Sequence, residues 1–452
     1  MSTLIKINPR IGWRNIGNEV VLFNCSNQQI VVWNKTASEL WAEISRGVTK
    51  DYLVNLIDKK YTHDTEKAQR DVICFLEEAA EMGFIDFKKS TQIPEKDFQN
   101  GENALLYIEM KAIKRLIPFA VTFETTYSCN ENCIHCYMDK NLPNLRFLEI
   151  QRILKEISDA GCLFVTFTGG EFFSRKDAIN ILECANEFHF AIDILSNGTL
   201  INENIVDTIT KCSVRRVQIS LYGATAKTHD SITRLPGSFN KTIKGIKFLR
   251  DAGIKVEIAF PMMKLNFHER YSVMNIADSM NCLLSPNHIV TARNNGDRDT
   301  YSLRITNEQL NEFLSDKNLF SLYAGRKPFH DHLLYLNLIS ILDAPPCYSG
   351  FNTCAITPQG EVLPCNQFLY SVGNLQTTSF KEIWKKSPEL AFIRNLRICG
   401  LPECSKCDKL DLCSRCPGLA LLEGGDLLGI SPENCRITET FCKLYQKGDE
   451  RL

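Results

Sequence analysis

Three cysteines on one short loop constrain this chain more than any other feature. Cys129, Cys133 and Cys136 lie in the run TYSCNENCIHCY, directly after an apolar, strand-like segment from Pro118 to Thr125. Three thiolates at this spacing can hold three irons of an iron–sulfur cube and leave the fourth iron without a protein ligand. An open coordination position is where a metal site does its chemistry. Buried core cysteines and a zinc knuckle are the alternatives, and the polar loop favours the cluster.

Composition narrows the class of protein. The chain has 452 residues, 44% of them hydrophobic, which is enough for two or three domains with hydrophobic cores. Its formal net charge of −1 gives no sign of a basic surface that would bind nucleic acid or an anionic membrane. The sequence starts without the apolar stretch of a signal peptide and has no apolar run of 18 residues. Nineteen cysteines in such a chain predict metal ligation in the reducing cytoplasm rather than disulfides.

Apolar strand-like runs alternate with amphipathic helices after Pro118. The alternation predicts an α/β fold in which six parallel strands, joined by helical crossovers, curve into a partial barrel. Chemistry in such barrels lies at the carboxyl ends of the strands. The predicted strands are 121–125, 164–170, 191–198, 216–223, 256–263 and 287–292, and the predicted helices lie near 147–160, 176–188, 203–211, 239–252 and 267–280.

A smaller α/β unit precedes the barrel. Residues 19–23 and 29–33 predict a β-hairpin, and Thr36 with Glu39 three residues later predicts a capping box that starts a helix. Two more helices, over 50–61 and 66–83, and a returning strand over 83–87 complete a winged-helix-like pattern. The predicted domains are this unit (1–90), a polar linker (91–117), the barrel (118–310), a helical bridging region (311–346) and a cysteine-rich region (347–452).

Polar motifs stand at the carboxyl ends of the predicted strands. The second strand ends in Gly169-Gly170-Glu171, where two glycines let the backbone approach a ligand closely. The third ends in Ser196-Asn197, which an ordinary capped turn would also use. Ser220 is a weaker candidate on strand four. In the loop expected at 228–239, His229 is predicted to be structural rather than functional.

A second set of cysteines occupies the last hundred residues. A zinc ribbon would explain two C-x-x-C pairs, but the five-residue gap between the pairs is short for a ribbon and an upstream block would stay unexplained. The set comprises Cys347, Cys354, Cys365, Cys404, Cys407, Cys413, Cys416 and Cys435.

The cysteine trio after the first barrel strand resembles the signature of the radical S-adenosylmethionine (SAM) superfamily, whose fold is a partial (β/α)6 barrel. The resemblance implies that a [4Fe–4S] cluster binds SAM through its open iron and cleaves it reductively to a 5′-deoxyadenosyl radical. Phe172 stands where the family often has proline. The implied SAM-binding residues are His135, beside the adenine, and Gly169, Gly170, Glu171, Ser196, Asn197 and Ser220.

The C-terminal set resembles the SPASM domain, which carries auxiliary [4Fe–4S] clusters. Cys413 and Cys416 enclose two residues where the family often has three, and Cys399 and Cys442 are alternative ligands. Without Cys354, the first auxiliary cluster would keep an iron able to bind a substrate thiolate. The family's crossed ligation implies Cys347, Cys365 and Cys416 for the first cluster, with Cys354 as candidate fourth ligand, and Cys404, Cys407, Cys413 and Cys435 for the second.

Residues 1–90 resemble PqqD-like peptide-recognition elements, which bind the leader of a ribosomally made precursor peptide by strand addition. A DNA-reading winged helix is the alternative, but the predicted helices are not markedly basic. Together the three resemblances imply a radical SAM/SPASM maturase of a ribosomally synthesised peptide, with the precursor peptide as partner and a flavodoxin or ferredoxin as electron donor.

The implied product is an intramolecular crosslink in that peptide. A thioether is the favoured bond, and a carbon–carbon crosslink is second. Three other classes remain as alternatives: a maturase of a folded protein, of the sulfatase-maturing type; a non-catalytic iron–sulfur electron carrier; and a peptide-binding scaffold that uses residues 1–90 alone. The motifs specify how a radical is made and leave the acceptor open.

Overall fold

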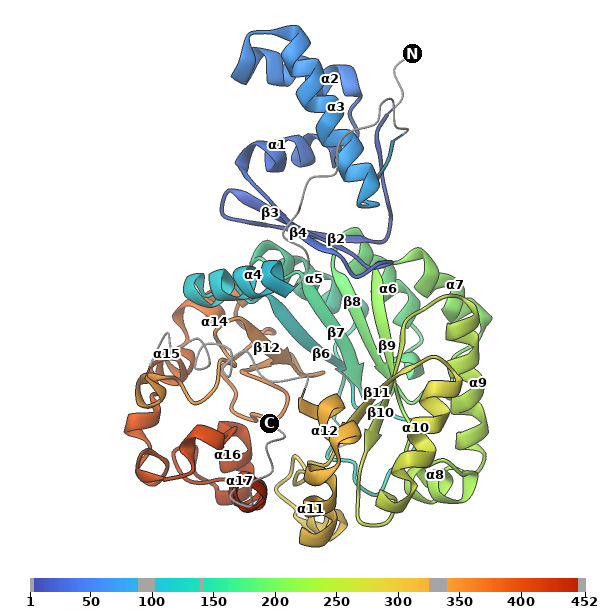
Figure 1. Ribbon diagram of the computed structural model, residues 1–452, viewed down its shortest axis with the longest axis vertical. Helices are drawn as coiled ribbons and strands as arrows, with labels where there is room; N and C mark the ends of the chain where they lie inside the picture. Colours follow the sequence, from blue (N-terminus) through green and yellow to red (C-terminus); the bar gives the residue numbers. More distant parts are fainter. Residues whose placement is uncertain (1–3, 88–101, 139–141, 325–339, 446–452) are drawn as a thin grey trace.

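A nine-stranded sheet forms the centre of the computed structural model, which describes residues 4–87, 102–138, 142–324 and 340–445 (Figure 1). Six of its strands are parallel neighbours in chain order, so the predicted partial barrel is confirmed. These strands are β6 (Ala120–Thr126), β7 (Phe164–Gly169), β8 (Ala191–Ser196), β9 (Val214–Ser220), β10 (Val256–Pro261) and β11 (Leu283–Asn287). The main crossover helices are α5 (Phe147–Asp159), α6 (Ala178–Glu187), α7 (Glu203–Lys211), α9 (Ser238–Asp251) and α10 (Arg270–Ser279).

Alternation along the strands separates a core face from a polar face. Val121 and Phe123 of β6 are buried against the helices in the main hydrophobic core. Thr122 and Glu124 alternate with these two residues and therefore face the concave side of the barrel, because successive side chains of a strand point to opposite faces. This arrangement puts polar groups on the side where a substrate can enter.

Two details of the barrel differ from the prediction. The sixth strand is Leu283–Asn287 rather than 287–292, and it includes Pro286. β11 is the edge of the sheet, where a missing N–H removes no ladder hydrogen bond, so proline is tolerated there. The expected loop 228–239 instead contains helix α8 (Ala226–Thr233), whose first turn is capped by Thr225.

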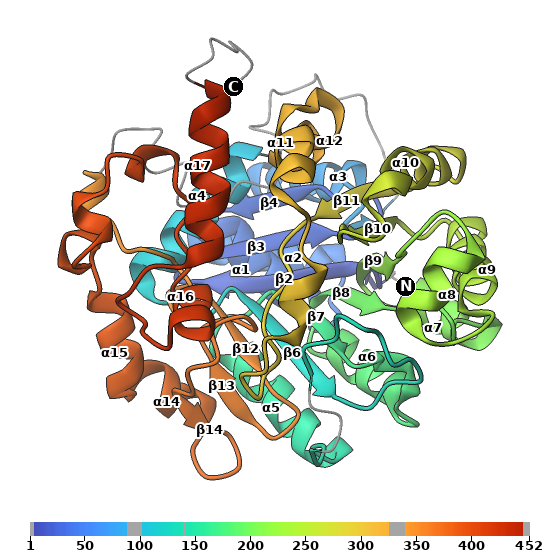
Figure 2. The ribbon, with the colours of Figure 1, turned by 90° about the horizontal axis from the view of Figure 1, so that it is seen from below.

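The C-terminal region continues the barrel sheet. β12 (Thr353–Ile356) pairs in parallel with β6, and β13 (Glu361–Leu363) and β14 (Gly373–Asn374) follow in antiparallel order. Figure 2 shows this extension beside β6, with α7–α10 on the opposite flank. The remaining helices are α11 (Asn307–Ser315), α12 (Lys317–Ala324), α14 (Phe380–Lys386), α15 (Pro388–Asn395), α16 (Pro417–Gly424) and α17 (Pro432–Tyr445).

The N-terminal unit contains the predicted hairpin and three helices. Strands β2 (Ile11–Ile16), β3 (Glu19–Asn24) and β4 (Ile30–Trp33) form an antiparallel sheet, and β1 (Lys6–Ile7) pairs with β5 (Ile85–Asp86). The predicted capping box at Thr36 is wrong. Helix α1 begins at Lys35, two residues earlier than a cap at Thr36 implies, and the Asn34 side chain accepts the Ala37 N–H, so Asn34 is the cap. The three α-helices of this unit are α1 (Lys35–Ile44), α2 (Lys50–Ile57) and α3 (Thr65–Glu81).

The predicted linker over 91–117 contains a helix. Residues 91–101 of that range, and 325–339 of the predicted bridging region, lie outside the described residues. Helix α4 (Glu102–Arg115) follows, and its Ile108 and Ala112 are buried against the underside of the N-terminal sheet. The apolar side chains spaced four residues apart make one face of α4 part of a core, which a linker composition does not reveal. Within the described ranges no helix is long and apolar enough to cross a membrane.

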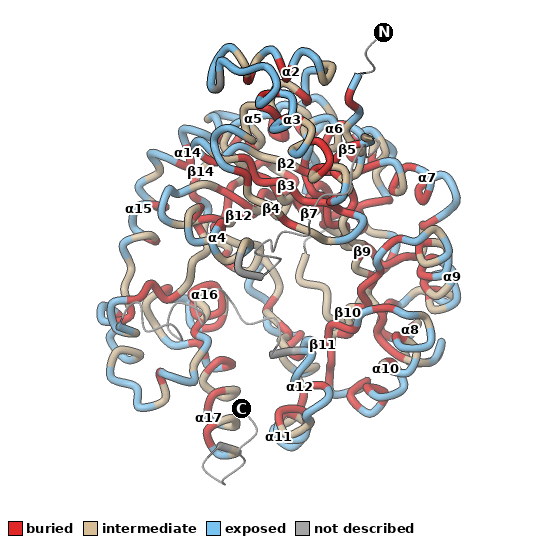
Figure 3. The backbone as a smooth tube through the Cα atoms, turned by 45° about the horizontal axis from the view of Figure 1, so that its top comes forward, coloured by how far each residue is buried: buried red, intermediate tan, exposed pale blue. Residues whose placement is uncertain are grey.

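The N-terminal sheet is buried on both faces. Val20 and Leu22 of β3 pack against the helices of their own unit, whereas Val21 and Phe23 pack toward α4 and the barrel. Figure 3 shows buried backbone continuing from β2 and β3 toward the barrel strands. The barrel strands begin at this interface, so the N-terminal unit lies at their amino ends, opposite the cysteine trio (Figure 1).

Arg14 fastens the unit to the barrel. Its guanidinium donates to the Cys162 carbonyl at 2.6 Å, to the Ser158 hydroxyl at 2.7 Å and to the Phe188 carbonyl at 2.8 Å. Burial lowers the pKa of Arg14 to about 10, so the side chain is still charged at neutral pH. One cation therefore satisfies three acceptors across the interface.

Replacing Arg14 by methionine should lower the free energy of unfolding by on the order of 2 kcal/mol, because the charge-assisted hydrogen bonds are lost and their acceptors stay enclosed. Arg46→Met is the control, since Arg46 is exposed just after α1 and, among the described residues, forms an ion pair with nearby Glu43 alone. Urea unfolding of both variants measures the difference. Equal losses would show that Arg14 does not hold the two units together.

Candidate cofactor site

The cysteine trio lies on the loop that leaves the carboxyl end of β6. Cys129, Cys133 and Cys136 are all half-buried. The pKa of the Cys133 thiol is raised by burial, by the Glu131 carboxylate and by the thiols of Cys136 and Cys129, so the three sulfurs lie near one another. The Glu131 backbone N–H points at the Cys129 sulfur over 3.4 Å. The loop thus presents three thiols with a hydrogen-bond donor already directed at one of them.

Backbone hydrogen bonds hold this loop against the opposite side of the barrel. The N–H groups of Asn132 and Ile134 donate to carbonyls of helix α8 at 3.0 Å each. The Arg293 guanidinium donates to the Cys136 carbonyl at 2.6 Å and the Ile134 carbonyl at 3.3 Å, and is itself fixed by Asp299 at 2.7 Å. Arg293 was not predicted as a site residue, since no local motif surrounds it.

The two glycines after β7 let the strand end approach the cysteine loop. Gly169 has φ +140°, and a Cβ there would lie 2.0 Å from the Thr126 carbonyl oxygen. A Cβ on Gly170 would lie 2.3 Å from the Ser128 carbonyl oxygen. Any larger residue would push the loop away, so both positions require glycine. The glycines therefore set the position of the loop as well as leaving room for a ligand.

Glu171 ties two predicted motifs together. Its buried carboxylate accepts the Ser196 hydroxyl at 2.9 Å, the Asn197 N–H at 2.7 Å and the Phe173 N–H at 3.0 Å. Asn197 in turn directs its side-chain amide toward the Cys129 sulfur at 3.9 Å. The structure thus brings Glu171, Ser196 and Asn197 together beside the cysteine loop. Their contacts with SAM remain a prediction.

His135 packs edge-on against Tyr222, with ring centroids 4.8 Å apart. Burial and the nearby Arg293 charge lower the pKa of His135 to about 4, so the ring is neutral at pH 7. Its Nδ1 is enclosed and has no hydrogen-bond partner among the described residues. A neutral ring with an unused nitrogen fits the predicted place beside an adenine. Ser220 ends β9 in the same region, two residues before Tyr222.

His229 has a structural contact that matches its prediction. Its buried Nδ1 accepts the Tyr222 N–H at 3.1 Å and so supports the residue against which His135 packs. Burial lowers the pKa of His229 to about 4. The histidine therefore acts on the site through Tyr222.

A buried carboxyl beneath the cysteine loop was not predicted. Glu124 of β6 accepts the Tyr127 hydroxyl at 2.9 Å and the Tyr137 hydroxyl at 3.3 Å, and Tyr137 directly follows Cys136. Burial raises the pKa of Glu124 to about 7 although both hydroxyls oppose the shift. A charged residue within the apolar run VTFET was the only sequence signal for it.

The first C-terminal cysteine group converges without Cys354. Burial and the thiols of Cys347 and Cys416 raise the pKa of Cys365 to about 12, which places these three side chains near one another. Cys354 instead lies in β12 opposite Val121, inside the main apolar core, and the nearby thiol is that of Cys162. The prediction of Cys354 as a fourth ligand is therefore not supported by its position, because β12 joins the barrel sheet and turns this side chain into the core.

The second C-terminal group also converges. The pKa of Cys435 is raised by burial and by the thiols of Cys413, Cys404 and Cys407. Cys442 lies near Cys407 and remains an alternative ligand, whereas Cys399 is exposed. Among the described residues, no three Cys, His, Asp or Glu side chains converge tightly enough to hold a single metal ion.

Substitution of Cys354 should separate core packing from ligation. Cys354→Ala is expected to keep the full iron content and lose about 1 kcal/mol of stability from the missing core sulfur. Cys365→Ala should lose one cluster's share of iron. Iron and sulfide analysis of protein purified without oxygen measures both. An equal loss of iron in the two variants would show that Cys354 is a cluster ligand.

Glu124 should make stability depend on pH. The pKa of Glu124 in the folded protein, about 7, lies above the usual carboxyl value. The contribution of Glu124 to the free energy of unfolding is therefore fully present in acid and is lost as pH rises from about 4.5 through 7. Glu124→Gln should remove this pH dependence, so the free energy of unfolding of the variant should rise relative to that of the wild type between pH 5 and pH 8. Urea unfolding at both pH values measures it, with exposed Glu183→Gln as control. A constant difference between Glu124→Gln and wild type would contradict the shift.

Three family models match consecutive parts of the chain. The radical SAM superfamily matches residues 123–277, the SPASM iron–sulfur cluster-binding domain matches residues 347–417, and coenzyme PQQ synthesis protein D (PqqD) matches residues 19–85. These ranges lie within the barrel, the cysteine-rich extension and the N-terminal unit, respectively. SAM, a SAM-binding cluster and auxiliary iron–sulfur clusters are accordingly the cofactors.

The similar proteins include more than one activity. An AdoMet-dependent heme synthase of Methanosarcina barkeri is 25% identical over 339 residues, covering 70% of this chain and 95% of the relative. The subtilosin biosynthesis protein AlbA of Bacillus subtilis is 28% identical over 281 residues, covering 59% of this chain and 60% of AlbA.

Among solved structures, Streptococcus suis SuiB bound to its precursor peptide SuiA superposes with a TM-score of 0.62 at 17% identity, covering 95% of this chain and 99% of SuiB. At this identity the likeness shows a shared fold over nearly the whole length. The matched segments follow one another in the order PqqD, radical SAM and SPASM, so the chain combines a radical SAM domain with a SPASM domain and an N-terminal PqqD domain.

Proposed function

We propose that this enzyme installs an intramolecular crosslink, with a thioether favoured, in a ribosomally synthesised precursor peptide. The observation that carries the proposal is the fixed attachment of the PqqD domain to the barrel that bears the cysteine trio. A peptide held by the PqqD domain is tethered to the cofactor site, which raises the local concentration of its reactive segment there.

The leader is expected to bind along β4, the last strand in the order β2–β3–β4. Trp33 of β4 packs against Phe75 of α3, with ring centroids 4.9 Å apart, so the strand edge runs beside an aromatic helix face. An extended leader would add main-chain hydrogen bonds to this edge and place alternate side chains against α3.

Distance sets a requirement on the peptide. The PqqD domain lies at the amino ends of the barrel strands, whereas the cysteine trio follows the carboxyl end of β6, which is seven residues long. At about 3.3 Å per residue, such a strand spans roughly 23 Å. The segment between leader and modified residues must therefore include at least about seven extended residues.

When bound, the SAM-ligated cluster supplies a carbon radical that removes a hydrogen atom from the peptide. The residues of this chain place that chemistry. Arg293 and the α8 carbonyls hold the cysteine loop, and Glu171 positions Asn197 beside Cys129. We expect a flavodoxin or ferredoxin to be the reductant, in the reducing cytoplasm.

Three cysteines in the first C-terminal group support the thioether. With Cys354 in the core, the group of Cys347, Cys365 and Cys416 would leave one iron of its cluster without a protein ligand. An iron left open in this way can bind a substrate cysteine sulfur and hold it for bond formation. A carbon–carbon crosslink is the alternative product, for which no substrate thiolate is needed.

Reaction with the precursor peptide tests the proposal. The reduced enzyme should release 5′-deoxyadenosine, and the peptide should lose two hydrogens per crosslink and, for a thioether, one alkylatable thiol. The variant with alanine at Cys129, Cys133 and Cys136 should lose modification by more than about a hundredfold but bind the leader with unchanged affinity, because β4 and the helices beside it pack in a cluster that does not include the cysteine loop. Modification by that variant would refute the proposal.

Heme synthesis is the second candidate, favoured by the similarity to AdoMet-dependent heme synthases over 70% of the chain. The same assay separates the two activities. A peptide maturase should show SAM cleavage that is stimulated by the precursor and weakened by Trp33→Ala, which removes the aromatic residue of the β4 edge. SAM cleavage that is neither stimulated by the precursor nor weakened by Trp33→Ala would favour heme synthesis.

A further inference from the structure

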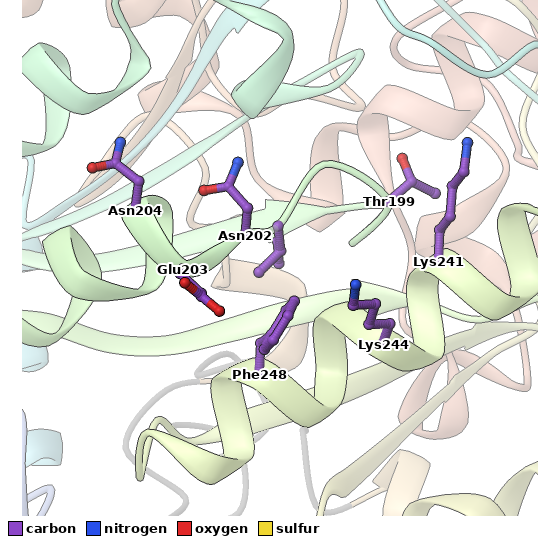
Figure 4. Close-up of a pocket in the computed structure, with 8 residues that line it drawn as sticks. Thr199, Asn202, Glu203, Asn204, Lys241, Lys244 and Phe248 are labelled. Carbon is purple, nitrogen blue, oxygen red and sulfur yellow. The ribbon is translucent and has the colours of Figure 1, made fainter.

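A hollow of about 470 Å³ lies on the flank of the barrel between α7 and α9. Its rim includes Thr199, Asn202, Glu203, Lys241 and Lys244 (Figure 4). Lys241 and Lys244 extend from α9 on the side nearer Thr199, and Glu203 lies farther along the hollow. Thr199 lies just after the carboxyl end of β8, so the hollow adjoins the end of the barrel that carries the cysteine loop.

Thr199, which lines the hollow, is hydrogen-bonded to the cysteine loop. The Asn130 side-chain amide donates to the Thr199 hydroxyl at 2.8 Å, and Asn130 directly follows Cys129. The Thr199 hydroxyl also donates to the Asn197 side-chain carbonyl at 2.7 Å, and the amide of the same side chain points to the Cys129 sulfur at 3.9 Å. Thr199 on the surface is therefore two hydrogen-bonded contacts from a thiol of the trio.

Helix α9 is also connected to the Cys129 thiol through Asn197. The Thr242 hydroxyl donates to the Asn197 carbonyl at 2.8 Å. Gly245 permits the approach, since a Cβ there would lie 2.3 Å from the Gly198 carbonyl oxygen. Lys241 precedes Thr242 on the exposed side of the helix, so the charged surface and the path to Cys129 occupy adjacent residues.

The surface of α9 beside the hollow is positively charged. Lys241, Lys244 and Lys247 recur every third residue and are all exposed. In the part of the chain that the structure describes, none of the three forms an ion pair, whereas Lys211 on neighbouring α7 pairs with Asp207 at 2.5 Å. Three exposed lysines without an ion pair make a local positive charge on a chain of net charge −1, and Glu203 is the acidic residue on the rim of the same hollow. Such a surface attracts an acidic protein and orients its encounter.

We propose that the hollow and the lysines of α9 form the docking surface for a small acidic one-electron carrier protein. This inference rests on the proposed function, because only a reductively activated cluster needs such a partner. One electron leaves the reduced carrier, which is oxidised by one electron, and enters the cluster held by Cys129, Cys133 and Cys136, which is reduced by one. No bond is made or broken in this step. Asn197 and Thr199 provide the contacts between the surface and Cys129.

Binding of recombinant flavodoxin to the full-length enzyme tests the surface without relying on catalysis. Lys241→Glu/Lys244→Glu should weaken the dissociation constant about tenfold or more at low salt, and 0.5 M salt should remove the difference. Lys381→Glu/Lys385→Glu is the matched control, since it makes the same charge change on exposed residues of α14, on the other flank of the molecule. Carbodiimide crosslinking should join flavodoxin carboxylates to Lys241 or Lys244.

Comparing two reductants separates this proposal from the proposed function. With flavodoxin, its reductase and NADPH, the α9 double variant should release 5′-deoxyadenosine about tenfold more slowly than wild type. With dithionite the two should react at the same rate, because the lysines do not touch the cysteine loop.

Equal flavodoxin affinity in the wild type and the α9 variant, or crosslinks only to other faces, would overturn the docking surface. Competition by inorganic phosphate alone, with no effect on flavodoxin, would reassign the hollow to small anions and also overturn it. Crosslinks from the precursor peptide instead of flavodoxin would assign the surface to substrate. Absence of SAM cleavage with dithionite in the wild type would instead count against the proposed function.

Discussion

The close approach of three thiols on one loop is the constraint on which the rest of the structure depends. Burial, the Glu131 carboxylate and the thiols of Cys136 and Cys129 raise the pKa of Cys133, and contacts from outside the loop hold these groups in place. That support comes from the glycines after β7, from α8 carbonyls and from Arg293. The barrel supplies all three from different strands, which explains why the cysteines need a whole sheet around them.

The same sheet also organises the two other domains. β12 extends it from β6, so the cysteine-rich region is built onto the barrel rather than tethered to it. At the other end, β3 is buried on both faces and Arg14 crosses the interface. The PqqD domain is therefore held at a set distance from the cysteine trio, at the opposite ends of the barrel strands.

Much of the fold could be predicted from the sequence because it follows from periodic patterns. Strand alternation located β6 to β10, and the hairpin of the first unit was placed to within a residue at its ends. Predictions failed where position in the sheet overrides local preference. Pro286 is tolerated because β11 is an edge strand, and α4 is stabilised by burial of Ile108 beneath another domain. In the site, the linear motifs were found, whereas Arg293 and Glu124 were missed because their partners are distant in sequence.

The sequence by itself determined the chemistry of the ligands, the order of the domains and the location of the motifs, because cysteine spacing and strand–helix alternation are properties of neighbouring residues. Only the tertiary structure decided which cysteines meet, since that depends on pairing between distant strands. It separated Cys354 from Cys347, Cys365 and Cys416 by placing it in a strand beside β6. It also joined Lys241 and Thr199 to Cys129 through Asn197, because helix α9 packs on the turn after β8.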